Sequence, residues 1–146
     1  MLSKSQARAF FLGGTVIFSG VFIALTVDTV RQTDARTKSQ NLTDAVKRGK
    51  LIWEKNNCMG CHTILGEGAY FAPELGNVMK RWKVQDDPAA ATEMLKGWMT
   101  SMPTGIEGRR QMPHFNLTDE EFKNLADFLL WTGKINTQNW PPNDAG

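Results

Sequence analysis

The sequence predicts an all-α protein with one apolar helix at its N-terminus and a small domain of three or four short helices after it. Residues 9–27 contain no charged side chain, whereas the rest of the chain has the polarity of an ordinary water-soluble domain. In that second part, apolar residues recur three and four positions apart, which is the spacing of one helix face. We therefore divide the chain into a transmembrane anchor at 1–30, a linker or helix extension at 31–40, and a domain at 41–146 with an extended C-terminal tail.

The anchor is predicted from the run AFFLGGTVIFSGVFIALTV at residues 9–27. A helix rises about 1.5 Å per residue, so this run is long enough to cross the roughly 30 Å hydrocarbon core of a bilayer. A cleaved signal peptide is the alternative, but its apolar stretch is usually about 7–15 residues and ends at a small-x-small site. No good site of that kind lies around Val27. Basic residues flank both ends of the run, so charge alone does not set the orientation.

The first helix of the domain is expected to open at 41–44 and to run to about Asn56. Val46, Gly49 and Trp53 share one face of it. Glycine inside a helix costs about 1 kcal/mol relative to alanine. We therefore expect another helix to cross closely at Gly49.

Two further helices follow. One is predicted over Pro88 to Thr100, with proline suited to its first turn and with four residues available for burial, namely Met94, Leu95, Trp98 and Met99. The other begins with the capping box formed by Thr118 and Glu121 and ends at Gly133. Its apolar residues keep helical spacing; they are Phe122, Leu125, Ala126, Leu129 and Leu130.

The intervening segments at 58–77 and 101–115 are predicted to be loops, and we expect no strand pair in the first of them. The tail after Gly133 is expected to be extended, because Pro141 and Pro142 cannot continue a helix. Loops of this length are uncommon in a small domain unless they have a function. A buried cofactor would account for them.

Composition narrows the function. The net charge is +2 and the charges of both signs are interspersed, so the dense basic face that nucleic acid requires is missing. The sequence also offers no Ser-His-Asp group, carboxylate pair or phosphate-binding loop. We therefore do not expect this chain to be a catalyst on its own.

The two cysteines of the chain both belong to the motif Cys58-Met59-Gly60-Cys61-His62. C-x-x-C-H is the attachment pattern of haem c. Two thiols about one turn apart can add to the two vinyl groups of the haem, and the adjacent histidine can bind the iron. The sequence thus predicts one covalent haem c on Cys58, Cys61 and His62, and a role in electron transfer.

Three alternatives compete with haem. Zinc would need four ligands, and the only other histidine is His114. A thioredoxin-like C-x-x-C would need a βαβ context. A short structural disulfide would leave His62 and the long loops unexplained. A haem-free metal-binding or redox-structural module is therefore kept as the alternative of another class.

A haem that only transfers electrons has both axial positions filled, and a thioether in the second position raises the potential. Met112, which precedes Pro113 in the loop before the last helix, is the expected second ligand. Met102 also precedes a proline and is the second choice, while His114 would instead give bis-histidine iron.

The surroundings of the iron can also be predicted. The second ring nitrogen of His62 needs an acceptor, usually a backbone carbonyl. Pro73 could supply that carbonyl, with Leu75 packing on the haem face. Arg109 and Arg110 could meet the haem propionates, a partner surface or water.

Three segments carry a resemblance to a known family: NNCMGCHTILGEGAYFAPELGNV, RRQMPHFNLTDEEFKNLADFLLWT and the tail NTQNWPPN. Together with Gly49 and Trp53, they resemble class I cytochromes c and, more narrowly, the cytochrome c subunits of bacterial nitric oxide reductase. The resemblance covers the anchor and essentially the whole soluble domain, and no ligand position departs from it.

The resemblance implies a single-pass protein of the bacterial inner membrane, with the haem domain in the periplasm. It implies a large multi-helix partner that contains haem b and turns two NO into N₂O and water in denitrification. The electron donor would be a small periplasmic cytochrome c or a cupredoxin. A calcium ion near the interface with that partner would draw ligands from the loop with Gly68 and Tyr70. The cytochrome c subunit of an oxygen-reducing membrane oxidase is the alternative within the same chemistry.

Overall fold

The computed structural model describes residues 3–108 and 111–138. The chain forms two compact units, Met1–Arg36 and Thr37–Gly146. We describe each unit by itself.

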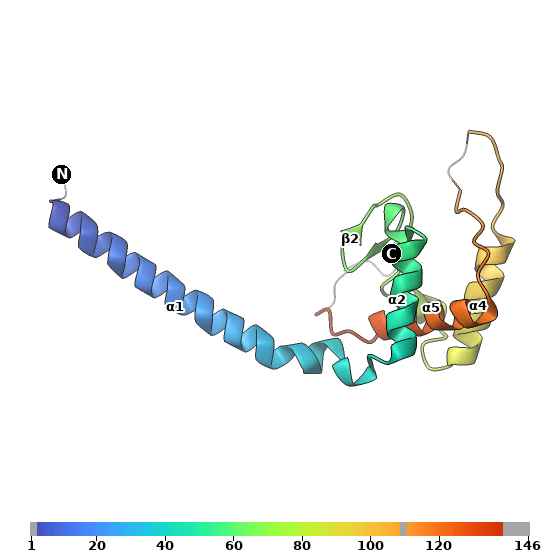
Figure 1. Ribbon diagram of the computed structural model, residues 1–146, viewed down its shortest axis with the longest axis horizontal. Coiled ribbons are helices and arrows are strands. Elements are labelled where there is room, and N and C mark those ends of the chain that lie inside the picture. The colour runs from blue at the N-terminus through green and yellow to red at the C-terminus, as the bar shows by residue number, and fades with distance from the viewer. Residues whose placement is uncertain (1–2, 109–110, 139–146) are drawn as a thin grey trace. The chain divides into compact units, whose positions relative to one another are not determined.

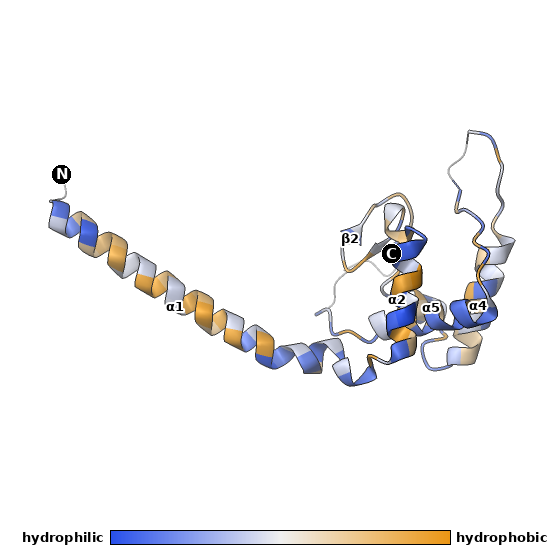
Figure 2. Ribbon diagram, in the orientation of Figure 1, coloured by the Kyte–Doolittle hydropathy of each residue, from blue (hydrophilic) through white to orange (hydrophobic). Residues whose placement is uncertain are grey.

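The first unit consists of one long helix, α1 (Lys4–Thr37). The helix is apolar along its middle and hydrophilic at both ends (Figure 2). By length and composition it could cross a membrane, with a mean hydropathy of 2.2 over its most apolar window. The hydroxyls of Thr15, Thr26 and Thr29 donate to the carbonyl four residues earlier at 2.8–2.9 Å. These polar groups are therefore satisfied within the helix, as a lipid environment requires.

The second unit contains the helices α2 (Asp44–Lys55), α3 (Val78–Arg81), α4 (Pro88–Ser101) and α5 (Asp119–Thr132), and the short 3-10 turns η1 (Ser39–Asn41) and η2 (Cys58–Gly60) (Figure 1). Side chains cap the long helices at their N-termini. Thr43 accepts from Val46 N–H, Asp87 accepts from two N–H groups of α4, and Thr118 forms the predicted capping box with Glu121. The three predicted helices are confirmed, whereas the four-residue α3 was not predicted.

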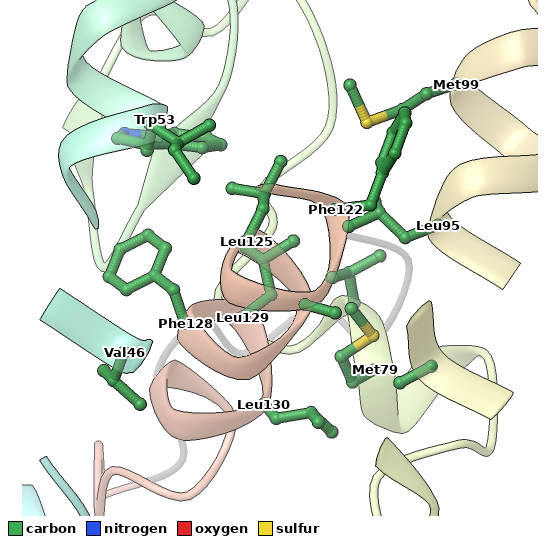
Figure 3. Packing of buried hydrophobic residues seen from close by; sticks show 14 residues of the cluster. Val46, Trp53, Met79, Leu95, Met99, Phe122, Leu125, Phe128, Leu129 and Leu130 are labelled. Atoms are coloured by element: carbon green, nitrogen blue, oxygen red, sulfur yellow. The ribbon is translucent and has the colours of Figure 1, made fainter. Parts of the chain in front are cut away.

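The core of this unit lies where α2 and α5 cross. Trp53 and Phe128 meet there with ring centroids 6.3 Å apart, and Leu125 and Leu129 lie beside them (Figure 3). A β-carbon at Gly49 would lie 2.6 Å from the Cβ of Phe128. The expected close crossing at Gly49 is therefore confirmed, as is the burial of every apolar position predicted for α5.

The prediction for α4 was only half right. Leu95 and Met99 are buried, but Met94 and Trp98 are exposed by 45 % and 49 %. Residues 91, 95 and 99 are spaced by four and form one stripe, which is the part of α4 that is buried. Met94 and Trp98 precede this stripe by one position and so lie beside it, where Trp98 packs against Trp82 with ring centroids 5.9 Å apart.

The prediction that residues 58–77 contain no strand pair was wrong. Strands β1 (Thr63–Ile64) and β2 (Glu67–Gly68) pair antiparallel, with Thr63 opposite Gly68 and Ile64 opposite Glu67. Leu65 and Gly66 connect them with φ angles of 53° and 83°. Two positive φ angles are typical of the tightest hairpin turns. Strands of two residues are too short to show an alternating pattern in the sequence.

Candidate functional site

The C-x-x-C-H motif begins directly after α2. Asn57, in the left-handed conformation (φ 51°), ends the helical segment, and η2 follows it. The backbone N–H groups of Cys61 and His62 donate to the carbonyl of Cys58 at 3.1 and 2.9 Å. Both cysteines are free thiols within this one turn. Cys58 is half-buried against the core, whereas Cys61 is exposed.

The chemistry of the thiols argues against a redox-active C-x-x-C pair. Burial, with a smaller contribution from the nearby Cys61, raises the pKa of Cys58 to about 11, although a backbone hydrogen bond acts in the opposite direction. A reactive C-x-x-C cysteine has a lowered pKa instead, because the thiolate is the nucleophile. At neutral pH the Cys58 thiol is protonated, which fits a site for covalent attachment better than one for thiol–disulfide exchange.

The imidazole of His62 is held by one hydrogen bond. Its Nδ1 lies 2.8 Å from the carbonyl oxygen of Pro73, which is the hydrogen bond predicted from the sequence. Since a carbonyl can only accept, Nδ1 carries the proton and Nε2 is left with a free lone pair. The ring also lies 6.2 Å from the ring of Trp53. This tautomer is the one in which a histidine binds a metal through Nε2.

A loop folds back over the motif and brings Pro73 to His62. Ala69 N–H donates to the carbonyl of Met59 at 2.9 Å, and Ala72 N–H donates to that of Cys61 at 2.9 Å. The return begins at Gly68, which has a φ of 125°, and a β-carbon there would overlap the carbonyl oxygen of His62. These backbone contacts were not predicted. The sequence shows only their trace, in the glycines and prolines of GEGAYFAPELG.

The predicted second ligand and its two rivals lie in or beside the loop between α4 and α5. Met112 is half-buried and packs against the core, as does Leu75. Met102 is half-buried at the end of α4. His114 is exposed, and its Nε2 lies 2.7 Å from the Met102 carbonyl oxygen. His114 thus already uses one ring nitrogen within the loop.

The remaining predicted positions are at the surface or outside the described residues. Tyr70 is 75 % exposed and Gly68 is also exposed. Arg109, Arg110 and the segment Trp140-Pro141-Pro142 fall outside the described residues. Within residues 3–108 and 111–138, no group of three or more His, Cys, Asp or Glu side chains is placed to hold a metal ion. The part of the chain that the structure describes therefore offers no zinc site.

Comparison with known proteins decides the family. Residues 46–133 match the cytochrome c family model. Over its whole length the chain is 66 % identical to the cytochrome c subunit of nitric oxide reductase from Paracoccus denitrificans, covering 98 % of that protein. The chain belongs to this family of nitric oxide reductase subunits. The corresponding proteins of Cereibacter sphaeroides and Stutzerimonas stutzeri are 58 % and 48 % identical to it, and the chain covers 98 % and 97 % of their lengths.

Membership of this cytochrome c family implies a haem c, and the residues present fit it. Cys58 and Cys61 are free to form two thioether bonds, and His62 presents an unprotonated Nε2. When bound, the haem supplies a one-electron Fe(III)/Fe(II) couple. The loop at 68–76 keeps the imidazole oriented, and the crossing of α2 and α5 fixes the start of the motif.

Proposed function

We propose that this chain is the membrane-anchored electron-transfer subunit of a nitric oxide reductase. It accepts single electrons from a periplasmic donor, a small cytochrome c or a cupredoxin, and passes them to a large haem b subunit. There, two NO, two electrons and two protons give N₂O and water. The observation that carries the proposal is the full-length similarity to nitric oxide reductase subunits together with an intact C-x-x-C-H motif whose histidine is already oriented for iron.

The site proposal includes both axial ligands. His62 binds the iron on one side, and Met112 binds it on the other, with Leu75 packing on the haem. Support comes from the Pro73 hydrogen bond and from the half-buried position of Met112 against the core. A methionine ligand raises the potential and leaves no free coordination site. The chain therefore carries electrons without turning over NO itself.

The topology is also part of the proposal. Residues 1–30 form a single-pass anchor in the inner membrane, residues 31–40 connect it, and residues 41–146 form the haem domain. The haem domain faces the periplasm, because covalent haem c attachment takes place outside the cytoplasm. The satisfied hydroxyls of α1 support a membrane position for that helix.

The last part of the proposal is a calcium ion at the interface with the catalytic partner. Gly68 and Tyr70 lie at the surface of the loop that covers the haem-binding motif, and oxygen ligands of such a loop suit Ca²⁺. Metal analysis of the purified complex tests it. Calcium should co-purify with the complex, and removing it with a chelator should weaken the association of the two proteins. A complex free of calcium that stays associated would contradict this part.

The function is tested by purification in mild detergent. The complex should consume NO with a reduced donor, and a Cys58→Ser, Cys61→Ser double variant should lose this turnover while the partner still co-purifies. A partner that reduces only oxygen would instead establish the oxidase alternative. If no partner co-purifies, or if the pyridine haemochrome spectrum lacks a haem with two thioether bonds, the proposal is wrong.

A further inference from the structure

Glu74 is a buried acidic residue next to the carbonyl that orients His62. We propose that Glu74 is a positioning residue of the haem site, which holds the Pro73 carbonyl against the His62 imidazole through hydrogen bonds of its own side chain. The inference rests on the proposed function, since His62 is an iron ligand only there. It concerns a residue that does not touch the imidazole itself.

The burial of Glu74 needs a reason. Its side chain belongs to a residue only 5 % exposed, and among the described residues it is the one acidic residue that is buried. A carboxylate out of water is costly unless it is hydrogen-bonded or paired. Oε1 accepts from the backbone N–H groups of Leu65 and Gly76 at 3.0 and 2.9 Å. Arg81 attracts the carboxylate electrostatically and donates from Nη2 to the Glu74 backbone carbonyl at 2.6 Å.

These hydrogen bonds connect the two segments that meet at the imidazole. The first segment is His62 to Leu65, and the second is Pro73 to Gly76. Three contacts run between them: His62 Nδ1 to Pro73 O at 2.8 Å, Leu75 N–H to Thr63 O at 2.9 Å, and Leu65 N–H to Glu74 Oε1 at 3.0 Å. Only the last depends on a side chain other than that of His62. Glu74 is thus the replaceable part of this connection.

The local backbone is shaped around the carboxylate. Leu65 adopts a φ of 53°, a left-handed conformation that costs a non-glycine residue energy, and its N–H is the group that Glu74 accepts. A β-carbon at Gly76 would lie 2.7 Å from Oε1 of Glu74. A side chain at position 76 would therefore displace the carboxylate, so the glycine leaves room for it.

The consequence for the iron follows from the hydrogen bond of His62. A carbonyl that accepts from Nδ1–H makes the imidazole a stronger donor, which favours Fe(III) and lowers the reduction potential. If the Pro73 carbonyl is no longer fixed, this hydrogen bond weakens and the potential rises. The charge of Glu74 would also favour Fe(III), so position and charge must be separated by the choice of variants.

Two variants make this separation. Glu74→Gln removes the charge but keeps an oxygen that can accept both N–H groups. Glu74→Asp keeps the charge but is one methylene shorter, so it cannot reach them. The readout is the exchange of the His62 Nδ1 proton with deuterated solvent, followed by NMR on the full-length chain with its haem in detergent. Glu74→Asp should speed exchange about fivefold or more, the factor that one typical hydrogen bond is worth, and should raise the potential. Glu74→Gln should leave exchange within about twofold of the parent, because its hydrogen bonds remain.

The controls are Glu93→Asp and Glu93→Gln on the exposed surface of α4, which should change neither readout. Parent-like exchange in Glu74→Asp would overturn the inference, and so would exchange in Glu74→Gln as fast as in Glu74→Asp. Since these two variants are compared with each other, a failure of Glu74→Ala to fold does not decide the matter. A parent chain without a low-spin haem would instead refute the proposed function.

Discussion

Gly49→Ala tests whether the crossing of α2 and α5 is as close as the structure shows. A β-carbon at position 49 would lie 2.6 Å from Cβ of Phe128 and closer still to the backbone carbonyl oxygen of Asn124, whereas ordinary contact begins at 3.4 Å. The carbonyl belongs to the backbone of α5, so no rotamer change can relieve the overlap. The two helices must move apart, and the packing of Trp53 on Phe128 must loosen.

Two opposing terms set the size of the effect. Alanine gains about 1 kcal/mol over glycine inside a helix. Overpacking a core costs typically about 1–3 kcal/mol, and a backbone clash belongs at the upper end of that range. We expect a net destabilisation of about 1–2 kcal/mol. Each kcal/mol lowers the melting temperature by roughly 4–8 °C in a domain of about this size.

The assay is guanidinium unfolding of the haem-bearing chain in detergent, followed by circular dichroism and by the haem absorption. Gly97→Ala is the matched control, because Gly97 lies inside α4 and a β-carbon there would meet nothing within 4 Å. The control should gain up to about 1 kcal/mol of stability from helix propensity. If Gly49→Ala is as stable as Gly97→Ala, the close crossing is refuted.

Three further expectations concern the start of α5 and the iron ligands. Thr118→Ala removes the side chain that accepts from Glu121 N–H at 3.2 Å and should cost about 1 kcal/mol in the unfolding free energy; a loss no larger than that of Thr100→Ala, on the exposed surface of α4, would contradict the capping role. Hydrogen bonds from Thr118, first from its backbone N–H and then from its hydroxyl, lower the pKa of Glu121, so the ionised group stabilises the fold above its unfolded pKa of about 4.3 and this contribution is lost as pH falls through the lowered pKa. Stability measured between about pH 5 and 2 should therefore fall less steeply in Glu121→Gln than in the parent, and equal slopes would show that the capping box does not titrate. Met112→Ala should abolish the low-spin absorption spectrum of methionine-ligated haem while Met102→Ala keeps it; the reverse result would exchange the two assignments.

The parts of the fold that could be predicted are those specified by local sequence. The start of α5 needs only the capping pair, and its buried face needs only the spacing of its leucines and phenylalanines. The close approach at Gly49 was predictable because a glycine in a helix is unfavourable without a packing reason. The His62–Pro73 hydrogen bond was predictable because a metal-binding histidine needs an acceptor for its second nitrogen.

The rest depends on contacts that the sequence pattern does not show. The two-residue hairpin is held by backbone geometry at Leu65 and Gly66, and leucine gives no signal of a left-handed conformation. Met94 and Trp98 are as apolar as Leu95 and Met99, so composition cannot tell which stripe of α4 meets α5. Glu74 was missed because acidic residues are almost never buried unless paired, and its partners are backbone N–H groups. The assignment of Met112 as a ligand stays a prediction.

The two sides of the candidate haem site differ in how they are built. The histidine side is assembled within residues 58–76, where each backbone contact joins positions close in sequence. The methionine side comes from the loop between α4 and α5, where Gln111 bonds both N–H and C=O of Ile106 and His114 bonds Met102. Its contacts to the core depend on how α4 packs against α5. The sequence can therefore specify the first ligand by a motif alone, whereas the second ligand is specified only by the folded domain.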